Sequence, residues 1–400
     1  VAIVVYKGLI PVVGRILTDI KAFALLLGAL LYVQASLSQT ASNTLLGERT
    51  RFRMYCKEYL SSCSLDSPKD ISKALWLISA FNQRGENVEG FLNRLSVCYD
   101  SLELRQQFDF ISLLKERKFD AKEVLLRKAF KSENNKLSLL AYSILNETGE
   151  GICNDRNYGL DWDNINTQIK EKNYKYELSQ LELTKLMEYA VTKYSQKYHL
   201  FVLVRENRNI PAKVYVVNSN GKVLNKKPLY YLARSANNTL PYFTNGNTPC
   251  GVFKIQGKSV SNNVYIGPVT TLVTELPFES EVTAWGITGK EWTEDMYASF
   301  LPLELRSLPM LWQAYDAGRV GRSEIIVHGS TIDPCFFSEE CFFPLTPSLG
   351  CLSAFEIWNP NDGSIMESHQ KSLMELLPDD RSSLGFMYVI QIDESAYRLF

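Results

Sequence analysis

The sequence has almost no net charge and very little histidine. Lysine and arginine number 43 against 44 aspartates and glutamates, and there are 3 histidines in 400 residues. A balance so close to zero gives no whole-chain argument for binding nucleic acid or another polyanion. No internal repeat or low-complexity segment is visible, which excludes repeat arrays. What is present is an ordinary globular composition, 46% hydrophobic, with enough apolar residues for sizeable cores.

The sequence also lacks an apolar run of about 20 residues, the length that a membrane-spanning helix needs. The nearest candidate, Ala22–Val33, is shorter; Arg15 and Lys21 precede it and small residues follow it as far as Ser38. This order of positive, apolar and small residues is typical of a secretory signal. We therefore expect residues 1–40 to be a signal peptide or membrane anchor, and the protein to be exported to the periplasm or cell envelope. An amphipathic or buried helix is the alternative.

A change of hydrophobic period predicts two domains after this segment. Residues 47–198 have helical spacing with start signals such as Ser67-Pro68, which predicts an all-α domain of unknown role. It is either a positioning or protein-partner module, or simply packed core. From residue 199 to residue 400 the pattern becomes that of strands with a few short helices, and Phe386–Ile392 is expected to be a closing strand. The fold class expected is therefore an all-α domain followed by a β-rich domain.

One pairing of histidine and cysteine in the second domain is suited to chemistry. His328 closes a β-branched run bounded by Gly329, so it is expected where a buried strand reaches the surface. Cys351 follows a tight turn that contains Gly350. A cysteine attacks acyl carbon as a thiolate, and a nearby imidazole lowers the pKa of the thiol and takes its proton. We therefore predict Cys351 as nucleophile and His328 as base.

Three segments around this pair carry a family resemblance. They are Thr248–Ile255 (TPCGVFKI), His328-Gly329 and Ser348–Leu352 (SLGCL). They resemble, in the same order, the TPxGxFxI, HG and SxGC blocks of the YkuD-type L,D-transpeptidases, over roughly the last half of the chain. The resemblance implies a YkuD-like β-sandwich in which the HG and SxGC blocks converge on one cleft. It also implies a peptidoglycan stem peptide as partner, no nucleic acid, and no cofactor or metal.

The same resemblance implies a mechanism and its participants. Cys351 would attack the carbonyl of the third residue of a stem tetrapeptide, and His328 would protonate the departing D-alanine. The N–H groups of Gly350 and Cys351 would face the oxyanion, while a main-chain carbonyl at Gly329, or another residue, would orient the imidazole. An amine acceptor would complete a cross-link, whereas water as acceptor would complete a carboxypeptidase reaction. A cysteine peptidase or amidase of the wall, and a catalytically silent wall-binding relative, are the alternatives.

Substrate-binding residues are expected beside the pair. Leu349 stands where many members of the family carry a second histidine, and Ser353 stands where an arginine or asparagine is common. Both departures bear on how a substrate carboxylate would be held. Arg319 and Arg322 flank glycines just before the strand of His328 and are candidates for that task, with solvated surface arginines as the alternative. The remaining expected contacts come from Ser348 and from Phe253, whose strand would line the site.

Eight cysteines leave an odd number if Cys351 stays reduced, so they cannot all pair within one chain. Cys335 and Cys341 lie in a loop longer than the family norm, and a disulfide between them is expected in an exported protein. The ring would hold Phe336, Phe337, Phe342 and Phe343 as an apolar flap over Cys351. A zinc site using both cysteines with His328 and Cys351 is the alternative, but the spacing lacks the usual CxxC pairs. The other histidines, His199 and His369, lie in no motif.

Overall fold

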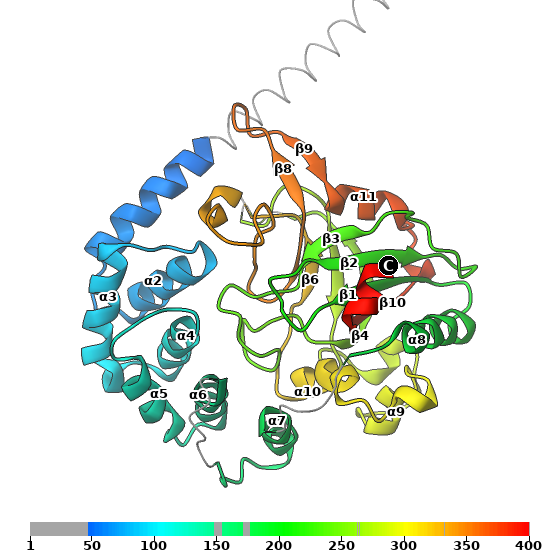
Figure 1. Ribbon diagram of the computed structural model, residues 1–400, viewed down its shortest axis with the longest axis horizontal. Helices are drawn as coiled ribbons and strands as arrows, with labels where there is room; N and C mark the ends of the chain where they lie inside the picture. Colours follow the sequence, from blue (N-terminus) through cyan, green and yellow to red (C-terminus); the bar gives the residue numbers. More distant parts are fainter. Residues whose placement is uncertain are drawn as a thin grey trace, which may run out of the picture. The chain divides into compact units, whose positions relative to one another are not determined.

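The computed structural model describes residues 47–147, 154–170, 177–261, 263, 265–331 and 333–399 (Figure 1). The expected signal segment, 1–40, lies outside the described residues, as does Cys153. The chain divides into two compact units, and the larger comprises 55–357 and 366–400. In the smaller unit, residues 47–54 are helical and the Arg49 guanidinium lies 4.4 Å from the ring centroid of Trp358. No helix of the described part of the chain is both long enough and apolar enough to cross a membrane.

Helices occupy the stretch of the larger unit where the sequence predicts them. Their bounds are α2 Pro68–Ala80, α3 Glu86–Val97, α4 Leu104–Leu114, α5 Lys122–Phe130, α6 Asn135–Glu147, α7 Leu160–Lys170 and α8 Gln180–Lys193. The start of α2 follows from local chemistry, because the Ser67 hydroxyl accepts from the Asp70 N–H at 3.3 Å and Pro68 takes the first helical position. A capping box of Ser179 and Glu182 opens α8.

The strands that follow close into one barrel. They are β1 Tyr198–Val204, β2 Ala212–Val217, β3 Leu229–Leu232, β4 Gly251–Ser259, β5 Thr271–Glu275, β6 Ile326–His328, β7 Leu352–Ala354 and β10 Leu384–Gln391. Their order around the barrel is β1-β10-β4-β5-β6-β7-β3-β2, with β1·β10 and β6·β7 parallel and the other described pairs antiparallel. A separate two-stranded sheet pairs β8 Glu356–Trp358 with β9 Ile365–Ser368.

The expectation of a YkuD-like β-sandwich is therefore wrong. A sandwich has two sheets with open edges, whereas here β3 pairs with both β2 and β7 and every barrel strand has two partners. The description of this half as β-rich also understates its helices: α9 Glu294–Ala298, α10 Gln313–Arg319, α11 His369–Leu376 and α12 Glu394–Leu399 lie among the strands, with several 3₁₀ turns. Strands such as β10 are buried along their whole length, and such apolar runs fit either architecture, so the local pattern could not separate them.

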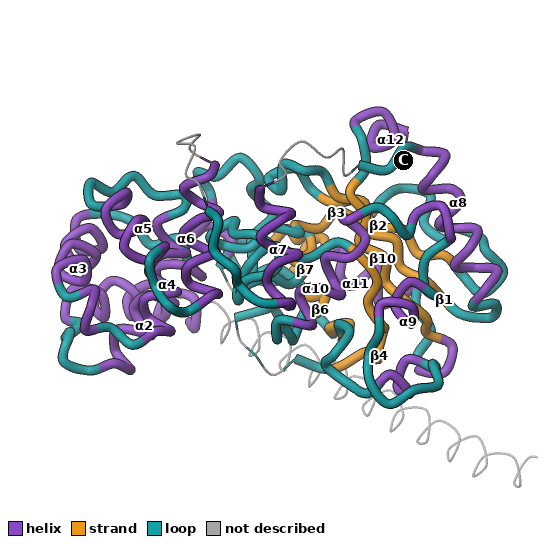
Figure 2. Tube along the Cα trace, turned by 90° about the horizontal axis from the view of Figure 1, so that it is seen from below, coloured by secondary structure: helices purple, strands orange, loops and turns teal. Residues whose placement is uncertain are grey.

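The helical region and the barrel share a core within the larger unit. Tyr242 and Phe243, from a loop between β3 and β4, are buried among the side chains of the helical core. The ring of Phe243 stacks on Trp162 of α7 with centroids 6.4 Å apart and meets Phe108 of α4 edge-on at 6.2 Å. Figure 2 shows α7 beside α10, next to the strands. The expected boundary near residue 198 thus marks a change of secondary structure inside one compact unit.

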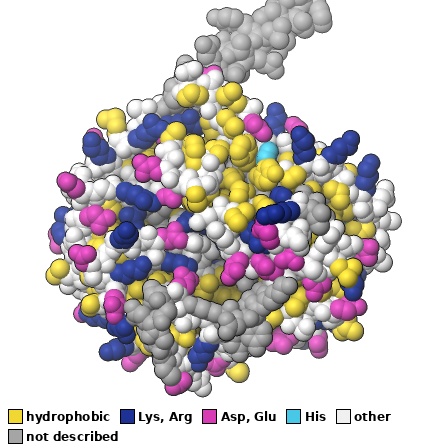
Figure 3. Space-filling model, in the orientation of Figure 1, with side chains coloured by type: hydrophobic (Ala, Val, Ile, Leu, Met, Phe, Trp, Pro, Cys, Tyr) yellow, Lys and Arg dark blue, Asp and Glu magenta, His cyan; other side chains and the backbone are white. Residues whose placement is uncertain are grey.

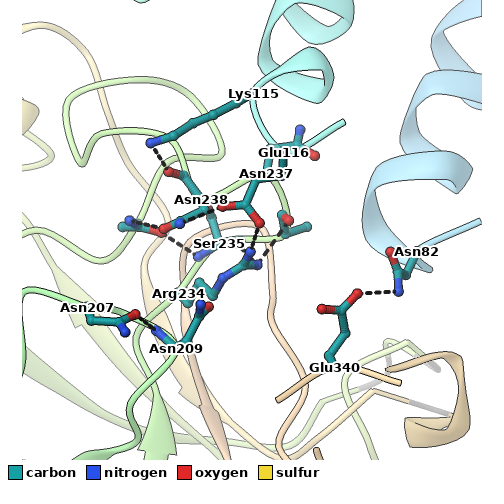
Figure 4. A network of polar contacts seen from close by, with 12 residues as sticks. Asn82, Lys115, Glu116, Asn207, Asn209, Arg234, Ser235, Asn237, Asn238 and Glu340 are labelled. Carbon is teal, nitrogen blue, oxygen red and sulfur yellow. Dashed lines mark hydrogen bonds and ion pairs between the residues drawn. The ribbon is translucent and has the colours of Figure 1, made fainter. Parts of the chain in front are cut away.

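A polar network fastens the end of α4 to the loop that follows β3 (Figure 4). Glu116 forms an ion pair with Arg234 and accepts from the Asn238 amide at 2.7 Å, and the Lys115 ammonium donates to the Asn238 carbonyl at 2.6 Å. The same loop reaches the segment before the cysteine, since the Ala236 N–H donates to the Ser348 carbonyl at 2.8 Å. The helical region is therefore linked, through one loop, to the turn that carries Cys351.

Candidate active site

His328 ends strand β6, and Cys351 directly precedes β7, the parallel neighbour of β6. In the pairing of β6 with β7, Val327 lies opposite Leu352 and His328 opposite Ser353. Cys351 is therefore level with Ile326, and the Ile326 N–H points at its Sγ at 3.4 Å. Because side chains along a strand alternate between faces, Ile326 and His328 share one face. The thiol and the imidazole both line one cavity of about 680 Å³.

The His328 ring is oriented by its own neighbour in the chain. Its Nδ1 lies 2.6 Å from the Gly329 carbonyl oxygen. A carbonyl can only accept, so Nδ1 carries the proton and Nε2 carries the lone pair. Burial lowers the pKa of His328 to about 4, and the bond to Gly329 offsets only part of that shift. The imidazole is consequently neutral at physiological pH and able to accept a proton.

A buried carboxylate that sequence analysis missed holds the turn behind His328. Glu356 accepts from the Ser330 N–H at 2.8 Å and from the Ser368 hydroxyl at 2.7 Å. A Cβ at Gly329 would lie 2.8 Å from the Glu356 Oε1, so this position has room only for glycine. The Ser353 hydroxyl donates to the Gly329 carbonyl at 3.4 Å. Nothing in the local sequence around Glu356 signals this role, because its partners come from other elements.

The Cys351 thiol is protonated at rest. Burial raises the pKa of Cys351, while the Ile326 N–H and the Arg322 charge act in the opposite direction. Glu324 and Glu279 add negative charge nearby, which raises the pKa further. The Sγ–H points at the Glu324 carbonyl at 3.5 Å. A raised thiol pKa and a lowered imidazole pKa both favour the neutral forms, so these two cavity residues are not a preformed ion pair.

The turn before Cys351 requires glycine at position 350. Gly350 has a φ of +116°, and a Cβ there would lie 2.1 Å from the Arg322 Nη2. Its N–H donates to the Ser348 hydroxyl at 3.1 Å, and that hydroxyl donates to the Cys351 carbonyl at 2.8 Å. Thr248, from the TPCGVFKI segment, donates to the Gly350 carbonyl at 2.9 Å. The Gly350 N–H expected to face an oxyanion is therefore already bonded inside the turn.

The two arginines expected to hold a carboxylate do not line the cavity. Arg322 is buried, and its guanidinium donates to the carbonyls of Pro241, Gly246 and Asn247. Burial lowers the pKa of Arg322 to about 10. Arg319 donates to Asp316 at 2.9 Å. Arg322 therefore fixes the loop against the Gly350 turn, which is a positioning task.

The other expected substrate contacts separate into two groups. Ser348 and Leu349 line the cavity. Phe253 is fully buried in the barrel core and paired with Met387 of β10, so its side chain does not reach the cavity. Ser353 is also buried and bonds the Gly329 carbonyl. Of these four expected substrate contacts, only Ser348 and Leu349 lie on the cavity wall.

The cavity wall is acidic and partly helical. Among the described residues that line it, Glu275, Glu279 and Glu324 are charged and there is no lysine or arginine. Trp76 and Phe81, at the C-terminal end of α2, form one wall, where the Trp76 ring meets that of Tyr265 edge-on at 5.2 Å. Figure 3 shows both charge signs interspersed over one face of the molecule, in keeping with the near-zero net charge. The acidic cavity is therefore a local feature.

The ring and flap expected of the long loop are wrong. Cys335 and Cys341 are free and exposed. Phe337 and Phe342 are buried against Leu232 and Leu345 in a small separate core, and none of the four phenylalanines lines the cavity. The alternative zinc site is not assembled either, because within the described ranges no three His, Cys, Asp or Glu side chains gather as metal ligands would. Cys351 thus lies in a cleft that these phenylalanines do not cover.

The two remaining histidines lie elsewhere. His199 is fully buried, and its Nδ1 accepts from the Phe386 N–H at 3.3 Å. His369 begins α11 and accepts from the Tyr230 N–H at 2.8 Å. Neither lines the cavity of Cys351. The assignment of His328 as the base therefore has no competitor among the histidines of the chain.

Comparison of the chain with protein-family models, with curated proteins and with solved structures gave no match. The three sequence blocks therefore stand as a resemblance, and the arrangement of His328 and Cys351 carries the functional argument.

Proposed function

We propose that the protein is a cysteine acyltransferase of the L,D-transpeptidase type. The observation that carries the proposal is that His328, at the end of β6, and Cys351, directly before the parallel strand β7, line one cavity, with the imidazole oriented by the Gly329 carbonyl. A nucleophile, a base and an orienting group are the parts that covalent acyl transfer needs. The resemblance in the three blocks adds the substrate class.

The first half-reaction forms a thioester. As Sγ of Cys351 attacks the carbonyl of the third stem-peptide residue, Nε2 of His328 takes the thiol proton. The Cys351 N–H is the main-chain donor left for the oxyanion, since that of Gly350 bonds Ser348. The imidazolium then gives its proton to the amine of D-alanine, which leaves as the C–N bond breaks.

The second half-reaction returns the enzyme to its starting state. An amine on a neighbouring stem attacks the thioester while His328 takes the amine proton, a new amide forms, and the Cys351 thiol is released with that proton. A cavity of about 680 Å³ is within the range of roughly 300–1,000 Å³ usual for ligand sites. A wall substrate places the protein in the cell envelope, in agreement with the signal-like pattern of residues 1–40.

Hydrolysis of the same acyl-enzyme is the second candidate. The observation that favours it is the position of the four loop phenylalanines, which do not cover Cys351 and so do not shield a thioester from water. The protein would then be an L,D-carboxypeptidase. Both candidates share the acylation step and differ only in the acceptor.

Incubation of the purified protein with a defined tetrapeptide muropeptide tests the proposal. Intact-mass measurement is expected to find an acyl adduct on Cys351, and product analysis is expected to find released D-alanine with cross-linked dimer. Free tripeptide without dimer would select the carboxypeptidase. Cys335→Ser is the matched control because Cys335 is exposed and outside the cavity. A folded protein that forms no adduct and releases no D-alanine would refute acyl transfer to this substrate and leave a wall-binding or amidase role.

A further inference from the structure

A second cavity of about 550 Å³ adjoins the first, and we call it the second chamber. Trp76 and Leu349 line both cavities. Leu349 is two residues from Cys351, so this shared wall lies within about 8 Å of Cys351 measured between Cα atoms. The walls of the second chamber come from α2, α4 and the start of α6 on one side and from the loop between β3 and β4 on the other. Its charged and polar lining includes Ser79, Arg105, Asp109, Lys136, Asn237, Thr244 and Asn245.

The two cavities differ in the sign of their charges. The first has Glu275, Glu279 and Glu324 and, among its described lining residues, no cation. The second has Arg105 and Lys136 against one carboxylate, Asp109. A negatively charged group on a substrate is repelled by the first cavity and attracted by the second.

Lys136 is held in place as a binding group would be. Its ammonium donates to the Thr244 hydroxyl and lies 5.2 Å from the ring centroid of Phe108. Burial, and after it the charge of Arg322, lower the pKa of Lys136, and Asp109 offsets that shift only in part. A partly buried ammonium gains from a further anionic partner more than an exposed one does, because water screens it less. Asn237, labelled in Figure 4, accepts from the Ser79 hydroxyl at 2.9 Å. This bond joins the loop between β3 and β4 to α2, on the opposite wall of the second chamber.

We infer that the second chamber is a subsite for a carboxylate of the peptide acyl donor, with Lys136 as its principal cation and Arg105 at its edge. The inference rests on the proposed function and names how the donor is oriented. The donor lies across Leu349 with its carboxylate between α4 and the start of α6, and its reacting carbonyl lies at Cys351. The helical region is thus part of the substrate-binding groove.

Binding to the Cys351→Ala protein tests the subsite without turnover. Calorimetry compares the tetrapeptide that has free carboxylates with the same peptide amidated at its carboxylates. We expect amidation to weaken binding at least about tenfold, the amount that corresponds to about 1.4 kcal/mol. Adding Lys136→Met should remove this difference, and Lys136→Arg should retain it. Lys131→Met is the matched control, since Lys131 is exposed outside the chamber.

Several outcomes would overturn the subsite. They are equal affinity for the two peptides, binding of neither, or a preference that survives Lys136→Met. If Lys136→Met does not fold, Arg105→Gln replaces it, because Arg105 is exposed. We expect Arg105→Gln to reduce the preference for the peptide with free carboxylates about threefold. An unchanged preference would count against the subsite. Acylation of the wild-type protein separates the two proposals. A binding preference without any acyl adduct would refute the proposed function alone, whereas equal binding and equal acylation by both peptides would refute the subsite alone.

Discussion

The Nδ1 of His328 and the carbonyl oxygen of Gly329 lie 2.6 Å apart, so the imidazole ring is oriented by the peptide group that follows it. A carbonyl fixes the tautomer but carries no full charge, and it therefore stabilises an imidazolium less than a carboxylate would. Burial dominates as a result, and the pKa of His328 falls to about 4. Burial also raises the pKa of the Cys351 thiol. In the proposed mechanism, proton transfer therefore accompanies the attack of sulfur on carbon.

This arrangement predicts how Cys351 reacts with iodoacetamide as the pH changes. Only the thiolate is alkylated, and its fraction rises about tenfold per pH unit below the thiol pKa. We expect the rate at Cys351, followed by peptide mapping, to rise steadily from pH 6 to pH 9 with no fast plateau at low pH. His328→Gln should leave this profile nearly unchanged. A plateau between pH 5 and pH 7 that disappears in His328→Gln would instead reveal a preformed thiolate–imidazolium pair.

Substitution of the pair should separate it from the other cysteines and histidines. Cys351→Ser is expected to abolish acylation by the tetrapeptide, and His328→Gln to slow it by about 10²–10⁴-fold, the usual loss when a general base is removed. Cys335→Ser and His369→Gln should stay within about threefold of wild type, because neither side chain lines the cavity. Acylation rates from intact mass give the comparison. An equally large loss in His369→Gln, in folded protein, would contradict the assignment of the base.

Gly350→Ala is expected to reduce acylation at least about 100-fold, since a shift of about 1 Å in the nucleophile can cost that much. The new Cβ would lie 2.1 Å from the Arg322 Nη2 and 2.5 Å from the Gly246 carbonyl, so the turn must move. Gly90→Ala is the control. Gly90 lies within α3 with open space around it, and alanine there should stabilise the fold by up to about 1 kcal/mol. Wild-type acylation in Gly350→Ala would show that the turn does not position the thiol.

The sequence predicted those parts of the protein that local signals determine. The cap at Ser67 and the strand Phe386–Ile392, observed as β10, Leu384–Gln391, depend on neighbouring residues and were recognised. His328 and Cys351 were each singled out because each ends a local pattern, a β-branched run in one case and a glycine turn in the other. Both side chains line one cavity, as expected.

What the sequence could not predict depends on partners far along the chain. Whether strands close into a barrel depends on which strand β3 pairs with on each side, and no alternation pattern encodes that choice. Arg322 was expected at the cleft, yet the chain folds three carbonyls from residues 241–247 onto its guanidinium. Phe337 and Phe342 were expected over Cys351, but Leu232, about a hundred residues earlier, provides an apolar site that buries them instead.

The buried His199 gives a prediction about the whole fold. Burial lowers the pKa of His199 to about 4, below the ordinary 6.5. Between those two values the unfolded chain binds a proton that the folded protein does not bind, so acidification favours unfolding. The contribution of His199 to stability is present above pH 6.5 and is lost as the pH falls toward 4. Over the range from pH 7 to pH 5 the loss is about 2 kcal/mol.

His199→Gln tests this, because glutamine does not titrate and its side-chain oxygen can accept from the Phe386 N–H in place of Nδ1. We expect the free energy of unfolding, measured in urea at pH 7 and pH 5, to fall by about 2 kcal/mol less in the variant than in the wild type. The test compares the pH-dependent loss of stability between the two proteins. Burial raises the pKa of Asp109 and of Asp316 to about 6, so these carboxyls favour the folded state as the pH falls, and they do so equally in both proteins. An equal loss of stability in the two proteins would mean that His199 is protonated as readily in the folded state as in the unfolded chain.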